Sequence, residues 1–161
     1  MKRHHAVSLS LQAALLLAFL PCSARSDAQI LVRNTTSGPY AITLKLESVV
    51  SFSGRHPEMI RDSGAEILSP DSPEHPNHHL GIFVDKAGKT VLSPQVRIRY
   101  RQIRPMTSPW TTLPAVRIHH SATGPETTHF GNNLYLQTGS YEFEVTVNDS
   151  SPAILTLTLR H

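Results

Sequence analysis

The chain after residue 28 consists of short runs in which apolar and polar residues alternate, separated by Gly, Pro, Asn, Asp and Ser. A period of two places successive side chains on opposite faces of a β-strand. Such runs cover 40–50, 79–84, 95–103, 134–137, 141–147 and 153–159, with further candidates at 29–33 and 113–119. This part shows no capped stretch with a 3.6-residue period. The sequence therefore predicts an all-β protein.

The number and spacing of these runs narrow the architecture. About seven or eight short strands in about 130 residues predict an immunoglobulin-like β-sandwich, with a small closed barrel as the alternative. The Cys-Trp-Cys pattern of true immunoglobulin domains is absent, since Cys22 is the single cysteine. We expect residues 29–161 to form one domain, because this length supports a single core without disulfides.

Residues 1–28 have the features of a secretory signal peptide. A basic start containing Lys2 and Arg3 precedes an apolar run at 13–20, which is too short to span a bilayer, and small residues at 26–28 offer a cleavage site. We therefore expect export to a bacterial periplasm and no membrane insertion of the mature chain. Cys22 leaves with the signal, so the mature chain has no thiolate ligand for a metal.

The charge of the chain does not indicate a polyanionic partner. Loss of the signal lowers the formal net charge from +3 to about +1. Arg97, Arg99 and Arg101 alternate along one predicted strand, so they should share one solvated face while the residues between them point inward. Tyr100, the one aromatic residue between these arginines, should point inward, so no aromatic side chain joins them on the solvated face and we expect no nucleic-acid partner.

Histidine is the residue type that stands out, with eight of the ten lying after residue 28. His79 opens a predicted strand, His119 ends one, and His129 is expected in the loop before the next. These strand ends could meet at one edge of a sandwich, and imidazole is a common ligand for copper, zinc, iron and nickel. His78 and His120 should point away from their neighbours. For each histidine taken singly, a hydrogen-bonded strand-end role is the alternative.

Other side chains could complete a site. Met59, in the long connection 51–77, offers a thioether that favours copper, and Glu126 offers a carboxylate that suits iron or Cu(II), or is an exposed loop residue. Met106 could be a ligand or fill a gap in the core. The segment 131–133 is expected to supply turn geometry. No catalytic motif is present, so we expect no enzymatic activity.

Several short motifs resemble the periplasmic iron-uptake accessory proteins. They are His79-Leu80, the strand 96–100, the stretch 119–125, and His129-Phe-Gly-Asn132 followed by the strand 141–147. The resemblance spans about residues 41–147. It implies an immunoglobulin-like, usually dimeric protein that binds copper, iron or another divalent ion beside an inner-membrane iron permease.

The resemblance also suggests a ligand set. His79 matches the family's strand histidine, His129 its loop histidine, and His119 falls where the family has a methionine ligand. Gly81 stands where the family has a strand glutamate, and Thr123 stands at an acidic position. The implied primary ligands are His79, His119 and His129, completed by Met59 or Glu126.

Together these features predict an exported homodimer that sequesters or delivers copper or iron, possibly to an inner-membrane permease. The second hypothesis is an adhesion or assembly module in which the histidines have no metal-binding role. The third hypothesis is a redox enzyme that uses bound copper.

Overall fold

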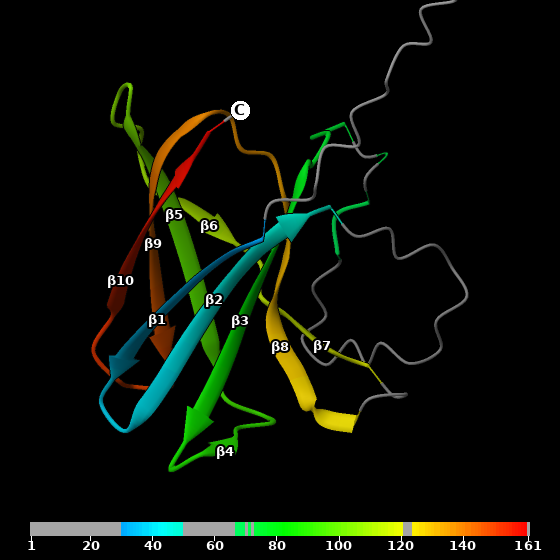
Figure 1. Cartoon of the computed structure of the whole chain (residues 1–161), viewed down its shortest axis with the longest axis vertical. Helices are drawn as coiled ribbons and strands as arrows, with labels where there is room; N and C mark the ends of the chain where they lie inside the picture. The colour runs from blue at the N-terminus through cyan, green and yellow to red at the C-terminus, as the bar shows by residue number, and fades with distance from the viewer. Residues whose placement is uncertain (1–29, 50–66, 70, 72, 121–123, 161) are drawn as a thin grey trace, which may run out of the picture.

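The structure is a computed structural model that describes residues 30–49, 67–69, 71, 73–120 and 124–160, with the backbone alone at 119, 120 and 124–126 (Figure 1). Within these ranges there are ten strands and no helix, hence no helix long and apolar enough to cross a membrane. The strands are β1 (Leu31–Ser37), β2 (Tyr40–Ser48), β3 (His78–Lys86), β4 (Lys89–Thr90), β5 (Val96–Arg104), β6 (Thr111–Leu113), β7 (Val116–His120), β8 (Gly124–Leu134), β9 (Gly139–Val147) and β10 (Ala153–Leu159).

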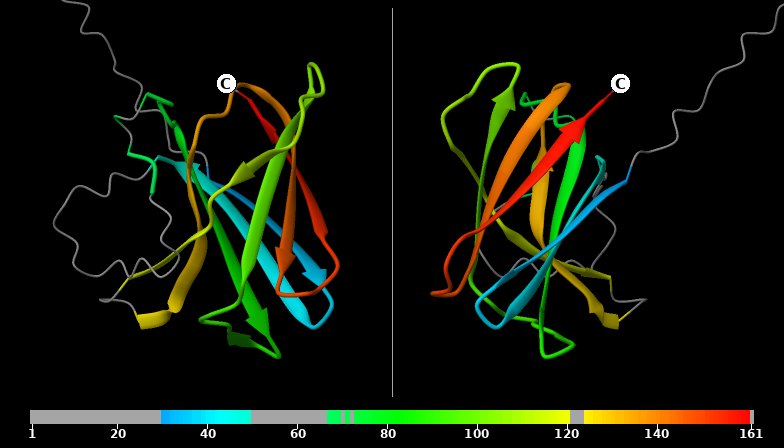
Figure 2. Two further views of the ribbon diagram at one scale, coloured as in Figure 1. Left: turned by 180° about the vertical axis from the view of Figure 1, so that it is seen from behind. Right: turned by 60° about the vertical axis from the view of Figure 1, so that its left-hand side comes forward.

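The strands form two antiparallel sheets. The larger has the order β1-β2-β3-β8-β7, with β4 paired to β3, and the smaller has the order β10-β9-β5-β6. Figure 2 shows the two sheets facing each other as layers. The predicted all-β sandwich is confirmed. The strands β4 and β6 are additional to the predicted set because two or three residues are too few to show alternation.

Alternation along the strands builds the core between the sheets. In β10 every second residue is buried, and in β2 Ile42, Leu44 and Leu46 point inward. They meet residues such as Ile82 and Phe143 in one apolar cluster. Complete burial of a side chain of this size contributes about 1.5–3 kcal/mol, so the cluster is what holds the two sheets together.

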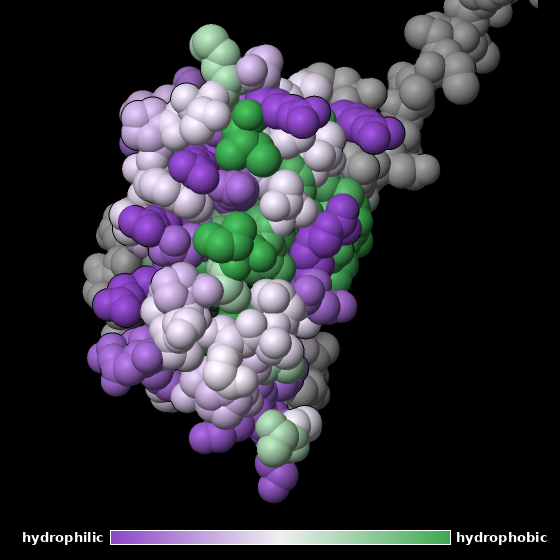
Figure 3. All heavy atoms as spheres, turned by 90° about the vertical axis from the view of Figure 1, so that its left-hand side faces the viewer, coloured by the Kyte–Doolittle hydropathy of each residue, from purple (hydrophilic) through white to green (hydrophobic). Residues whose placement is uncertain are grey.

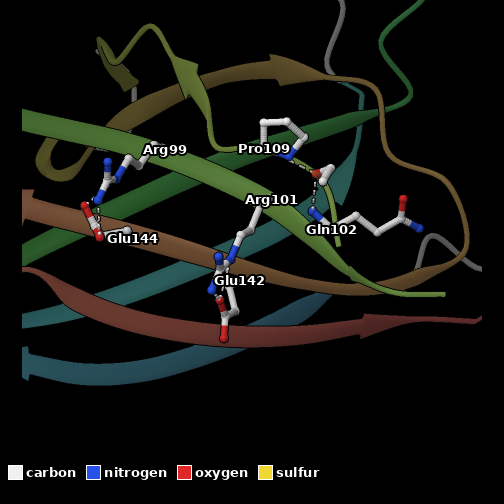
Figure 4. Close-up of polar contacts among 7 residues, drawn as sticks. Arg99, Arg101, Gln102, Pro109, Glu142 and Glu144 are labelled. Atoms are coloured by element: carbon white, nitrogen blue, oxygen red, sulfur yellow. Dashed lines mark hydrogen bonds and ion pairs between the residues drawn. The ribbon is translucent and has the colours of Figure 1, made fainter. Parts of the chain in front are cut away.

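Arg97, Arg99 and Arg101 of β5 lie on the solvent face of the smaller sheet, as predicted. Arg99 pairs with Glu144 at 2.6 Å and Arg101 with Glu142 at 2.6 Å, both across β5 and β9 (Figure 4). Both guanidinium groups also lie over the Trp110 ring, with their carbons 4.9 and 4.5 Å from its centroid. Ion pairs this exposed add little to stability, so these residues form a polar, solvated surface on one face of the strand.

Figure 3 shows the side of the molecule where β1 and β10 lie, with apolar patches between strongly polar side chains. These two edge strands contact each other, and each leaves an apolar side chain exposed, Val32 at 44% and Ile154 at 49%. Scattered apolar residues of this kind are normal on protein surfaces.

Three predictions about particular segments are wrong. The segment 134–137 is not a strand of its own, because β8 ends at Leu134 and the next strand, β9, begins at Gly139. The segment 131–133 is not a turn, because β8 begins at Gly124 and continues through these residues to Leu134. His129 therefore lies inside a strand and not in a loop. Met106 does not fill a gap in the core, since it follows the end of β5 and is 78% exposed.

Candidate metal site

The candidate site lies on the outer face of the larger sheet, where β3 and β8 run side by side. On β3, Leu80, Ile82 and Val84 point into the core, so His79 and Gly81 point to the opposite face. The register places His79 across from Asn133 and Gly81 across from Gly131. His79 is only 2% exposed although it is outside the core.

The geometry of two imidazoles defines the site. Nε2 of His79 lies 3.2 Å from Nε2 of His129, and the two rings meet edge to face at 84°. The His129 ring also packs on Phe83, with ring centroids 5.1 Å apart. Two residues that are fifty positions apart in the sequence are thus brought together by the pairing of β3 with β8.

The other nitrogen of each ring is held by an acceptor. Nδ1 of His79 donates to Oδ1 of Asn133 at 2.9 Å, and Nδ2 of that asparagine donates to the carbonyl of Leu68 at 2.7 Å, which sets the orientation of the amide. Nδ1 of His129 donates to the carbonyl of Thr127 at 3.1 Å. With a proton on each Nδ1, a neutral imidazole carries its lone pair on Nε2. The two lone pairs therefore face each other.

Burial keeps both rings neutral. It lowers the pKa of His79, against the opposing effects of the Asn133 hydrogen bond and the Glu47 charge. It lowers the pKa of His129 to about 4, against the hydrogen bond to Thr127. At neutral pH the facing nitrogens therefore bear no proton between them, and two lone pairs at this distance repel each other. A bound cation would turn the repulsion into attraction.

Two glycines permit this arrangement. A Cβ at Gly131 would lie 1.7 Å from the carbonyl oxygen of Leu80, so only glycine lets β8 come this close to β3. A Cβ at Gly81 would lie 3.1 Å from Cδ2 of His129, so the missing side chain leaves room for the ring.

The facing nitrogens fit a transition-metal ion. Metal–imidazole bonds are about 2.0–2.1 Å long, so nitrogens 3.2 Å apart subtend roughly 100–105° at one ion. Ligands on opposite sides of an ion would be about 4 Å apart, so these two would be adjacent ligands. Neutral imidazoles suit copper, zinc, iron and nickel, and the pair alone leaves coordination positions for further ligands.

The structure brings together two of the five predicted ligands, His79 and His129. The backbone of His119 lies in β7, one residue after Ile118, which is across from His129, but its side chain is outside the described part. The same holds for the side chain of Glu126, and Met59 lies outside the described residues altogether. Among the described residues, no three His, Cys, Asp or Glu side chains converge as a metal site.

The neighbouring histidines do not join the pair. His78 points away from His79, as predicted, and its Nδ1 lies 2.7 Å from Oδ1 of Asn77. His75 is exposed and precedes β3.

Sequence reasoning missed the residues around the pair. The sequence predicts a turn at Asn133 because Gly and Asn tolerate a positive φ, whereas the residue lies in β8. A cavity of about 300 Å³ beside the pair is lined by Lys45, Glu47, His79, Gly81, Phe83, Thr127 and His129. The first two come from β2, and the register of β2 on β3 could not be read across the long connection between them.

No protein-family model matches the chain, and no curated protein matches it. Among solved structures, a copper-bound variant of FetP from uropathogenic Escherichia coli strain F11 is similar to this chain. It is 10% identical, with a TM-score of 0.49, over 83% of this chain and 95% of that one. A likeness of this size carries no argument about function, which therefore rests on the chain's own residues.

Proposed function

We propose that this protein binds a transition-metal ion through His79 and His129, and that it sequesters or delivers the ion. The observation that carries the proposal is the pair of Nε2 atoms at 3.2 Å, each with its Nδ1 held by an acceptor. Copper is our first choice of ion, because divalent copper binds nitrogen donors most tightly among the first-row metals, and the family resemblance makes iron the second.

The proposed location and partners of the protein are inferred from its sequence. The signal-like residues 1–28 support a periplasmic location, and the family resemblance supports a homodimer that passes its ion to an inner-membrane iron permease. We assign no catalytic activity to the site. Its task would be to hold an ion and release it.

The chain's own residues would prepare the site before any ion arrives. Asn133 and Thr127 hold the two rings in the tautomer that ligates through Nε2, so little ordering is needed on binding. Because burial lowers the pKa of both histidines, protons compete for these nitrogens only in acid. Binding should therefore persist well below pH 6.5, lower than the ordinary histidine pKa suggests.

Isothermal titration with Cu(II) tests the proposal. We expect tight, stoichiometric binding by the purified protein and a loss of at least about 100-fold in affinity in the double variant His79→Ala/His129→Ala. The control variant is His75→Asn, which removes an exposed imidazole outside the site. The backbone at His75 has a φ of 44°, which asparagine tolerates, so this variant should bind Cu(II) as the wild type does. Equal weak binding by all three proteins would overturn the proposal and favour an adhesion or assembly module.

Asn133 provides a second test. Asn133→Leu removes the acceptor for Nδ1 of His79 and should weaken Cu(II) binding by about 10- to 100-fold, the usual effect of losing such a support. Asn133→Asp keeps an acceptor at this position and should retain more of the affinity. If Asn133→Leu binds like the wild type in the same titration, the asparagine does not position His79.

A further inference from the structure

A lysine and a glutamate on β2 lie beside the histidine pair. The register places Glu47 directly across from His79 and Lys45 directly across from Gly81. Directly opposed residues of antiparallel strands share one face of the sheet, with their Cβ atoms about 4.5–5.5 Å apart. Both β2 side chains therefore stand on the face that carries the pair, and both line the cavity next to it.

These two side chains are paired with each other. Nζ of Lys45 lies 2.7 Å from Oε2 of Glu47, with the side chains 35% and 26% exposed. A pair this exposed adds little to stability, so it can exchange for a stronger interaction at low cost. A divalent ion at the histidine pair would offer that interaction, because it carries twice the charge of the ammonium group.

The pair of histidines lies close to both charges. Glu47, across from His79, brings a negative charge to the face that carries both imidazoles, and Lys45, across from Gly81, brings a positive charge there. A cation bound between the rings would experience the same two influences. The carboxylate is thus placed to attract an ion at this position, and the ammonium group to oppose it.

We propose that Glu47 turns from Lys45 and supplies a carboxylate oxygen as the third ligand of the ion held by His79 and His129. This inference rests on the proposed function. It needs only side-chain rotation, because β2 is fixed between β1 and β3 and its register is not altered. Lys45 would hold the carboxylate until an ion arrives, and the resulting set of two nitrogens and one oxygen suits Cu(II), zinc and iron.

Two variants that break the same ion pair test this assignment. Glu47→Gln and Lys45→Gln both remove the contact, so a purely structural ion pair predicts equal effects. If Glu47 is a ligand, Glu47→Gln should weaken Cu(II) binding by at least about tenfold, while Lys45→Gln should leave it unchanged or tighten it. The electron paramagnetic resonance spectrum of bound Cu(II) should change with Glu47→Gln and stay the same with Lys45→Gln.

The control is Glu142→Gln, which removes a paired carboxylate from the smaller sheet. Thermal unfolding in the presence of a chelator would confirm that all three variants are folded. Wild-type affinity and spectrum in Glu47→Gln, or equal weakening by the two β2 variants, would overturn the role of Glu47 while leaving the histidine site intact. Absence of binding by the wild type, or binding that survives removal of both histidines, would instead overturn the proposed function.

Discussion

Replacing Gly131 with alanine is expected to destabilise the protein by more than about 4 kcal/mol, an exceptional cost for one methyl group. The added Cβ would lie 1.7 Å from the carbonyl oxygen of Leu80 and 2.8 Å from its carbonyl carbon. Both atoms belong to the backbone of β3, so relief requires separating β3 from β8 at the centre of the larger sheet. Urea unfolding followed by circular dichroism, with a chelator present, would measure the loss.

Gly88→Ala is the matched control for this prediction. Gly88 has a φ of 74°, which alanine adopts with some strain, but a Cβ there meets nothing within 4 Å. The expected cost is only about 1 kcal/mol. Equal stability of the Gly131→Ala protein and the wild type would mean that β3 and β8 do not approach this closely. The two histidine Nε2 atoms would then not be held 3.2 Å apart.

The fold could be predicted where burial follows a period of two. The strand β10 alternates along its whole length, and β9 and β2 nearly so, because each has one face in the core and one in solvent. Most of β8 could not be recognised, because it contains Gly, Pro and two asparagines, which are depleted in strands. Near its end, Gly131 allows close packing against β3, and Asn132 and Asn133 form side-chain hydrogen bonds.

The site could be predicted only as far as single residues carry a chemical signature. Imidazole is such a signature, and it singled out His79 and His129. Asn133 and Glu47 have common side chains whose role depends on what lies opposite them, which is the strand register. That register is set by three-dimensional pairing of β3 with β2 and β8, across long separations in the chain.

Acidification is expected to destabilise the protein through His129 when a chelator keeps metal away. In the folded protein the pKa of His129 is about 4, whereas in the unfolded chain it should be near the ordinary 6.5. Between these values the unfolded chain binds the proton and the folded protein does not. The free energy of unfolding should therefore fall as the pH drops from 6.5 to 4, by up to about 3 kcal/mol.

His79 should add to this loss, since its pKa is also lowered by burial. Urea unfolding at intervals between pH 7 and pH 4 would measure the slope, and the variant His129→Gln should flatten it, because glutamine does not titrate. Other groups that titrate in this range affect both proteins alike, so the difference between the two curves isolates the histidine. If the curves run parallel, His129 is not buried as a neutral base.

The same two nitrogens decide how a metal changes this behaviour. A bound ion takes the position that a shared proton would occupy between the rings, and it must be displaced before either ring can be protonated. We therefore expect saturating Cu(II) to hold the stability of the wild type level to a lower pH than chelator does, with no such protection in His79→Ala/His129→Ala. Equal acid sensitivity with Cu(II) and with chelator would show that the facing nitrogens are a structural contact and do not bind the ion.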